Sequence, residues 1–271
     1  MNEIPKSGFL EELSRIPSSQ VEQAIKQVRK DVLNESFFVI PNNDGEAVRA
    51  AKILRAARAP HLDATPLPWG VKLDEMFSTP GQIKYQFIER LQKIGVKRVV
   101  LFELPAPNLE KALKDHGFEV TIIDHHKYSE YDRWKPESSL EQLMTLINWP
   151  KSRADEAIAV NDRGYVPGMK KMGLTDDEIR QVRLNDYIGQ GQDPRAVRES
   201  FRQAEEALPK LKTREGVYIL DLPPDVNPSV VKEELAIRAK DGLASSIEIY
   251  PGKIGFSGNP KIVNAFLEKI D

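Results

Sequence analysis

The sequence contains no cysteine in its 271 residues. This absence excludes disulfide bonds and thiolate metal sites, and it fits a reducing cytosol. The chain also lacks an excess of either charge, because 39 Lys and Arg face 41 Asp and Glu, which gives a net charge of -2. A protein with this balance has no general attraction for a polyanion, so binding to nucleic acid would need a local basic groove.

Long apolar runs are missing as well. The N-terminal stretch M-N-E-I-P-K-S-G-F-L lacks the apolar core of a secretion signal, and no segment approaches the roughly 20 apolar residues of a membrane helix. We therefore expect a cytoplasmic protein with no membrane partner. A chain of 271 residues can bury one large core or two smaller ones, and we favour two domains.

What the sequence does contain is an alternation of strand and helix patterns. Apolar, β-branched runs predict strands at residues 36–41, 98–104 and 118–124, separated by segments with helical spacing, and a further strand at 156–162. Strands that alternate with helices in this way favour an α/β fold with a parallel sheet and right-handed crossovers.

A second, shorter alternation begins at Gly216, with three strand patterns, one helix between them and a final helix. Before it lies a charged helical stretch, which G-Q-G-Q-D-P interrupts at residues 189–194. The expected organisation is a parallel-sheet domain over residues 1–188, a helical linker over 189–214 and a smaller α/β domain over 215–271.

Groups that can bind a cation end the strands predicted in the first domain or begin the loops that follow them. They are Asp44, Glu103, the run Asp124, His125 and His126, and Asp162. Because the carboxyl ends of parallel strands meet at one edge of a sheet, where ligand sites form, we expect these groups to lie together. Carboxylate oxygens and imidazole nitrogens suit Mn²⁺ or Mg²⁺, and such an ion polarises phosphoryl oxygens and activates water for hydrolysis.

The triplet D-H-H at residues 124–126, with N-N-D-G before it and V-N-D-R-G-Y after it, resembles the motifs of the DHH phosphoesterase superfamily. The resemblance spans nearly the whole chain. It implies an N-terminal α/β domain with four metal-binding motifs, joined by a helical linker to a smaller, DHHA1-like lobe that binds substrate. It also implies hydrolysis of a phosphodiester or phosphoanhydride in an oligonucleotide, a cyclic dinucleotide or a polyphosphate, and it allows a homodimer.

The resemblance also assigns roles to individual residues. It implies that Asp124 orients His125 by hydrogen bonding and that His126 faces the substrate phosphate. It implies that one metal ion is held by Asp44, Glu103, His125 and Asp162.

In the C-terminal lobe, the segment G-F-S-G-N-P resembles a glycine-rich loop that holds phosphate or the end of a nucleic acid. The resemblance implies that backbone N–H groups here bind an anion, helped by the positive N-terminus of the next helix. Asn259 replaces the histidine of the family pattern. The implied substrate-binding residues are Gly255, Ser257, Gly258 and Asn259.

The first metal-binding motif departs from the family pattern. Asn42, a weak ligand, stands where the family has an aspartate, and Phe38 and Ile40 stand where an upstream histidine or aspartate belongs. Because neither apolar side chain binds a cation, we expect one Mn²⁺ or Mg²⁺ rather than two. Two-metal catalysis stabilises both the attacking and the leaving oxygen, so a single ion predicts slow or absent turnover. The alternative to a phosphohydrolase is therefore an inactive relative that binds a nucleotide, a nucleic acid or a partner protein as a scaffold.

Simpler structural roles compete for some of these residues. The sequence N-D-G favours a turn and a helix cap, so Asp44 on its own is best explained as a cap. Asp162 and Arg163 could form a surface ion pair, and His116 before a glycine is typical of the end of a helix. We favour a metal site because several such groups coincide with predicted strand ends.

Overall fold

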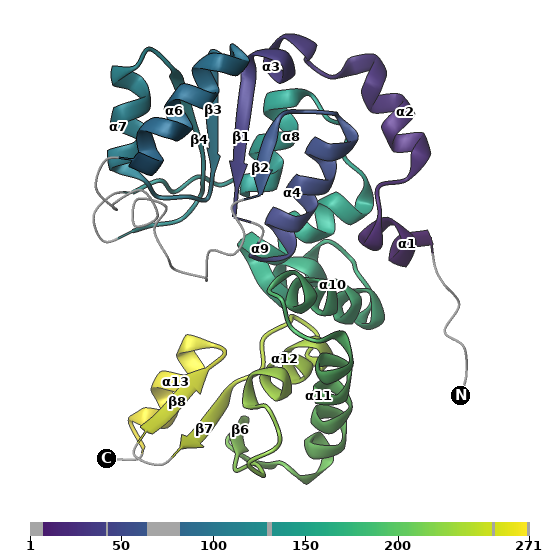
Figure 1. Ribbon diagram of the computed structural model, residues 1–271. Coiled ribbons are helices and arrows are strands. Elements are labelled where there is room, and N and C mark those ends of the chain that lie inside the picture. The colour runs from purple at the N-terminus through teal and green to yellow at the C-terminus, as the bar shows by residue number, and fades with distance from the viewer. Residues whose placement is uncertain (1–7, 42, 64–81, 129–131, 251–252, 270–271) are drawn as a thin grey trace. The chain divides into compact units, whose positions relative to one another are not determined.

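The computed structural model shows an α/β protein with two sheets (Figure 1). Among the residues it describes, no helix combines the length and the apolarity needed to cross a bilayer. The described residues are 8–41, 43–63, 82–128, 132–250 and 253–269.

Contacts within the chain divide it into two compact units. Unit 1 comprises Met1–Arg163 with Gly189–Gly191, and unit 2 comprises Gly164–Ile188 with Gln192–Asp271. Each unit contains its own four-stranded sheet. The domain boundaries expected from the sequence, after residues 188 and 214, stay a prediction about which segments fold independently.

Unit 1 is built on a parallel sheet with the strand order β2-β1-β3-β4. Leu101 pairs with Val39 on one side and with Ile122 on the other, which fixes the register of the three longer strands. These three strands confirm the sequence prediction, whereas the short strand β2 was not predicted. The bounds are β1 (Ser36–Ile40), β2 (His61–Asp63), β3 (Arg98–Phe102) and β4 (Glu119–Ile123).

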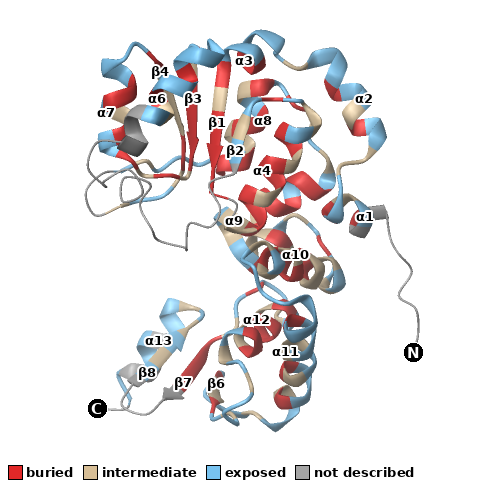
Figure 2. Cartoon of the chain, viewed as in Figure 1, coloured by how far each residue is buried: buried red, intermediate tan, exposed pale blue. Residues whose placement is uncertain are grey.

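Helices cover both faces of this sheet, and buried residues concentrate between the layers (Figure 2). Val39 and Leu101 pack with helices α6 and α7 in one core cluster. Because side chains alternate along a strand, Phe38 and Ile40 point to the opposite face, where each is 1% exposed. The flanking helices are α6 (Gln82–Ile94) and α7 (Pro107–Asp115) on one face and α4 (Gly45–Ala56) and α8 (Ser139–Ile147) on the other.

The strand predicted over residues 156–162 is wrong, because these residues belong to helix α9 (Arg153–Lys171). A short apolar run such as A-I-A-V fits either structure by its pattern. Reciprocal bonds at its start favour the helix: Asp155 N donates to Ser152 Oγ at 3.2 Å, and Ser152 N donates to Asp155 Oδ2 at 2.8 Å. Helix α9 breaks at Tyr165, which has φ 49° and ψ −150°, so Asp162 lies before the break.

The strand order creates a topological switch point between β1 and β3. The chain leaves β1 for β2 on one side, and it later enters β3 on the other side of β1. The connections after the two central strands therefore diverge at the carboxyl edge of the sheet, the place where ligands bind in open α/β sheets. Helix α4 begins shortly after β1, and Glu103 directly follows β3.

Unit 2 contains a mixed sheet with the order β5-β6-β7-β8, in which β6 and β7 are parallel and the outer pairs are antiparallel. Three of these strands were predicted, and β5 adds a fourth at the end of the expected linker. The strands are β5 (Lys212–Arg214), β6 (Val217–Leu220), β7 (Ser246–Tyr250) and β8 (Lys253–Ser257). The helices that lie in this part of the chain are α10 (Asp176–Gly189), α11 (Pro194–Ala207), the 3₁₀ turn η1 (Leu208–Lys210), α12 (Pro228–Arg238) and α13 (Pro260–Leu267).

Gly258 connects β8 to α13 in a conformation that excludes a side chain. Its φ is +111°, and a Cβ atom there would lie 2.4 Å from Ser245 Cα. We expect Gly258→Ala to destabilise unit 2 more than Gly216→Ala, because Gly216 has φ +79° but no atom of a described residue within 4 Å of its Cβ position. The excess should be about 1–3 kcal/mol, the usual cost of overpacking. Urea unfolding of both variants measures it, and equal losses would contradict this account.

Candidate metal centre

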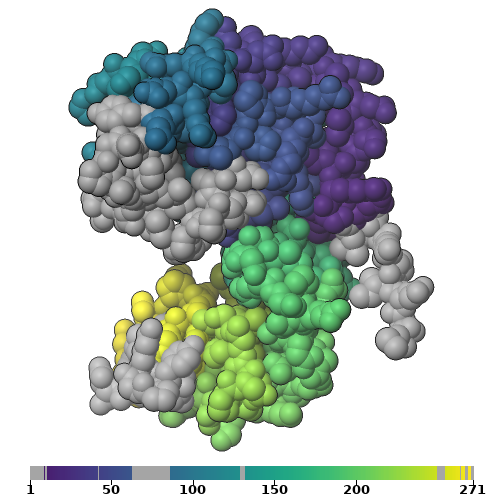
Figure 3. Space-filling model, in the orientation of Figure 1, coloured from purple at the N-terminus to yellow at the C-terminus, as the bar shows by residue number. Residues whose placement is uncertain are grey.

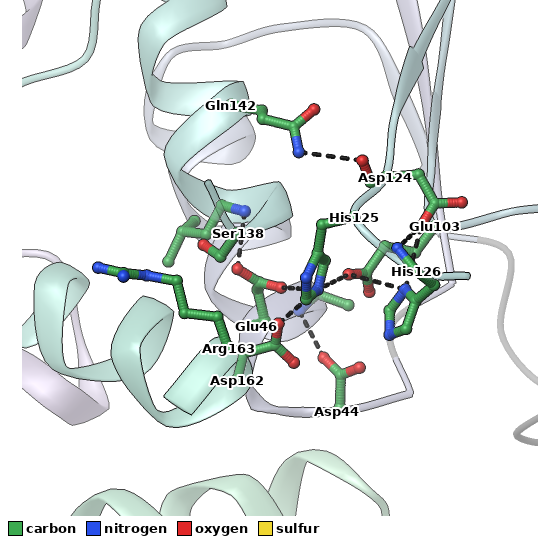
Figure 4. Close-up of polar contacts among 12 residues, drawn as sticks. Asp44, Glu46, Glu103, Asp124, His125, His126, Ser138, Gln142, Asp162 and Arg163 are labelled. Carbon is green, nitrogen blue, oxygen red and sulfur yellow. Dashed lines mark hydrogen bonds and ion pairs between the residues drawn. The ribbon is translucent and has the colours of Figure 1, made fainter. Parts of the chain in front are cut away.

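Four side chains of unit 1 converge near the carboxyl edge of the parallel sheet (Figure 4). Glu46 lies on α4, Glu103 follows β3, His125 follows β4 and Asp162 lies on α9. His125 Nε2 is 2.6 Å from Asp162 Oδ2, 3.4 Å from Glu103 Oε1 and 3.9 Å from Glu46 Oε2. All four ligand atoms lie within 4.8 Å of one another.

These four atoms are buried, and none makes a hydrogen bond within the described part of the chain. Even the 2.6 Å approach of His125 to Asp162 is not aligned as a hydrogen bond. An ion with ligands at about 2.1 Å in an octahedron holds neighbouring ligand atoms about 3.0 Å apart and opposite ones about 4.2 Å apart. The observed separations are close to this range, and carboxylates with one imidazole are suitable donors. The residues present therefore fit a divalent metal ion.

Glu46 is the member of this cluster that the sequence analysis missed. It lies in the first turn of α4 and is 2% exposed. Its Oε1 accepts a hydrogen bond of 2.8 Å from Leu140 N at the start of α8, which holds the carboxylate while Oε2 faces the cluster. The available signal was a second acid two residues after Asp44, in the first turn of the helix that follows β1.

Asp44, predicted as a ligand, lies at the N-cap of α4 and accepts a hydrogen bond of 2.7 Å from Ala47 N. This is the capping role that the sequence left open. Among the described residues, Asp44 belongs neither to this cluster nor to the other potential ligand group, which consists of Glu103, His125 and His126. Its role as a ligand stays a prediction, and Asn42 lies outside the described residues.

Glu103 has a left-handed backbone conformation, with φ 50°. Its N–H donates to Ile123 O at 2.8 Å, which ties it to the end of β4. Such a conformation in a residue with a side chain costs about 1–3 kcal/mol, and strained residues of this kind concentrate at functional sites. The strained turn directs the Glu103 carboxylate, whose side chain is 6% exposed, into the cluster.

Asp124 is buried beside His126. It accepts hydrogen bonds from His126 N at 3.1 Å, from His126 Nδ1 at 3.0 Å and from Tyr128 Oη at 2.9 Å. The family resemblance assigned it to orienting His125, whereas these contacts orient His126. The His126 side chain is 44% exposed, and its contact with Asp124 raises its pKa despite partial burial. The exposed rim of the cluster therefore carries a group that favours positive charge, and His126 also forms a second potential ligand group with Glu103 and His125.

Burial and mutual contact control the protonation of the cluster. Burial opposes the charged form of His125, but contacts with Asp162 and Glu103 outweigh it and raise the pKa of His125 to about 10. Burial raises the pKa of Glu46 well above its usual value, and the carboxylates of Glu103 and Asp162 add to this shift. Burial also acts to raise the pKa of Asp162, but contact with His125 keeps it below its usual value. Without a metal ion, His125 and Glu46 therefore retain protons that a cation must displace.

The predicted substrate-binding residues lie in unit 2. Ser257 and Gly258 help line a cavity of about 330 Å³ together with Lys232 of α12. Asn259 N donates to Ser245 Oγ at 3.2 Å, and Asn259 Oδ1 accepts from Lys261 N at 3.0 Å in the first turn of α13.

Gly255 packs against the side chain of Glu248 and does not line this cavity. Ser257 Oγ and Ser246 Oγ are 2.8 Å apart, so this hydroxyl also links β8 to β7. The roles of these residues in binding a substrate stay predictions.

No protein-family model matches the chain, and no curated protein is significantly similar to it. One similar solved structure is the crystal structure of exonuclease RecJ bound to manganese, which is 14% identical, with a TM-score of 0.32. The match covers 96% of this chain and 84% of that chain.

The raised pKa of Glu46 predicts a change in stability with pH. Above the usual carboxyl pKa, the unfolded chain loses this proton while the folded, metal-free protein retains it, so stability falls as pH rises toward the folded-state pKa. Glu46→Gln removes this pH-dependent loss, because glutamine does not titrate. Its amide oxygen can still accept the hydrogen bond from Leu140 N. Urea unfolding with EDTA at pH 5 and pH 8 should therefore show a stabilising effect of the substitution that grows with pH. The exposed Glu156→Gln is the control, and a pH-independent effect of Glu46→Gln would contradict the prediction.

Proposed function

We propose that this protein is a metal-dependent phosphohydrolase of the DHH superfamily, which acts on a phosphodiester or phosphoanhydride. One divalent cation, Mn²⁺ or Mg²⁺, is held by Glu46, Glu103, His125 and Asp162. The observation that carries this proposal is the convergence of four buried ligand atoms that make no hydrogen bond with any residue the structure describes. The resemblance of the D-H-H triplet and its neighbouring motifs to the superfamily supports the class of reaction.

The groups around the cation have different roles in binding a phosphate. When bound, the ion polarises a phosphoryl oxygen and makes water a better nucleophile at neutral pH. His126 uses Nδ1 to contact Asp124, which leaves Nε2 as the ring nitrogen that donates to a phosphate oxygen. Asp124 keeps the imidazole oriented and favours its charged form, so it acts through His126 rather than on the substrate.

The substrate class we propose is a phosphate-containing molecule such as an oligonucleotide, a cyclic dinucleotide or a polyphosphate. A cavity in unit 2, lined in part by Ser257 and Gly258, supports this substrate class, because part of a phosphate-containing molecule can bind there. Lys232 also lines that cavity, although it forms an ion pair of 2.5 Å with Glu248.

One observation favours the second candidate, a catalytically inactive binding or scaffold protein. Phe38 and Ile40 are core residues, each 1% exposed, so the positions that would serve a further ion in the family pattern are apolar and enclosed. The cluster also balances much of its own charge, because His125 stays protonated beside Asp162. Metal binding without turnover on any phosphoester would favour this alternative.

Hydrolysis of bis-p-nitrophenyl phosphate with Mn²⁺ tests the enzymatic proposal. We expect His125→Ala to reduce kcat/KM by more than the roughly 10–100-fold typical of groups that only support a ligand. His116→Ala is the matched control, since His116 ends α7 and belongs to neither ligand group. Equal activity of His125→Ala and the wild type would exclude the proposed site.

The affinity for Mn²⁺ should rise with pH. Because the pKa of His125 is about 10 in the metal-free cluster, binding near neutral pH displaces its proton. Each proton released raises the binding constant by about tenfold per pH unit. Isothermal titration calorimetry at pH 6.5 and 7.5, in buffers that differ in ionisation enthalpy, counts the protons. An affinity that is constant over this range would show that the ion binds elsewhere.

A further inference from the structure

Two of the proposed metal ligands lie on helices that share a second, buried contact. On α4, Arg49 lies one turn beyond Glu46, and on α9, Asp155 lies two turns before Asp162. Residues spaced by three or by seven share one face of a helix. Arg49 Nε and Asp155 Oδ1 are 2.6 Å apart, and their side chains are 1% and 0% exposed. Helices α4 and α9 therefore meet at two polar points, the cluster and this ion pair.

Both members of the pair are held from several directions. Arg49 Nη1 donates to Glu12 O in α1 (Gly8–Ser14) at 2.7 Å, and the surface of α1 adjoins that of α4 in Figure 3. Asp155 Oδ2 accepts from Gln20 Nε2 at 2.6 Å and from Ser152 N at 2.8 Å. These bonds restrict both groups, and the pair links the two helices at one buried point.

A gain in stability is a poor explanation for the presence of a buried ion pair. The cost of removing two charges from water often exceeds their attraction, and apolar residues of similar volume stabilise as well or better. The feature that an apolar contact lacks is directional geometry, because a guanidinium and a carboxylate meet in few arrangements. The position of the pair, on the faces that carry Glu46 and Asp162, makes that geometry useful.

We propose that Arg49 and Asp155 are positioning residues for the metal centre, which set the distance between the Glu46 and Asp162 carboxylates. This inference rests on the proposed function for its link to metal binding. The pair does not touch the ion. It acts through the two helices, whose register decides whether both carboxylates reach the same point.

The test replaces the pair without leaving a buried charge. The double variant Arg49→Met with Asp155→Asn keeps an acceptor for Ser152 N and removes the ion pair. We expect its Mn²⁺ affinity, measured by calorimetry, to fall by roughly 10–100-fold, the usual effect of groups that orient ligands. The control is Arg180→Met with Glu234→Gln, which removes an Arg–Glu pair between α10 and α12 in unit 2, where Arg180 Nε and Glu234 Oε2 are 2.9 Å apart. The control should change affinity by less than about twofold.

Unchanged Mn²⁺ affinity in a folded double variant would overturn the inference. If the double variant does not fold, Arg49→Lys decides in its place, because lysine keeps the charge but not the forked contacts. Wild-type affinity in Arg49→Lys would then overturn it.

Crystal structures of the metal-free wild type and double variant give a readout that does not depend on metal binding. We expect the Glu46 and Asp162 ligand atoms, which now lie within 4.8 Å of each other, to move farther apart than that in the variant. An unchanged cluster in the variant would refute the positioning role. Absence of Mn²⁺ binding to the wild type would instead refute the proposed function, and the crystal comparison would still decide the role of the pair.

Discussion

The burial of four ligand atoms, from three carboxylates and an imidazole, around one point is the constraint on which the rest of unit 1 depends. Carboxylates this close repel one another, and burial adds to the cost of their charge. The cluster therefore requires a compensating positive charge. Protons on His125 and Glu46 supply it in the metal-free protein, and a divalent cation would supply it more completely, because it would contact all four ligand atoms at once.

The parallel sheet explains how these groups reach one place. Glu103 and His125 follow adjacent strands, so the register of β3 and β4 brings them near each other, and the left-handed turn at Glu103 directs its carboxylate. Glu46 and Asp162 lie on helices, and their positions depend on how those helices pack. The bond from Leu140 N to Glu46 and the buried contact of Arg49 with Asp155 provide that control. The strands thus supply half of the centre, and helix packing supplies the other half.

The sequence predicted the strands of unit 1 better than the elements whose position depends on helix packing. The strands β1, β3 and β4 were predicted, because β-branched apolar runs followed by polar residues are a local pattern. The segment 156–162 was assigned to a strand, because a short apolar run does not distinguish a strand from a buried helix. Asp162 still reaches the cluster, since α9 passes the same edge of the sheet. Asp162 thus lies beside Glu103 and His125, as expected, although it belongs to a helix and not to a strand.

The sequence by itself determined the α/β class, the alternation of strands and helices and the presence of cation-binding groups after β3 and β4. These are consequences of local periodicity and of residue type. Only the tertiary structure decided that Glu46 faces the cluster while Asp44 caps its own helix, and that Asp124 holds His126. Those choices depend on the phase of α4 against α8 and on contacts between residues far apart in the chain, because hydrogen-bond partners are selected by packing and not by spacing along the sequence.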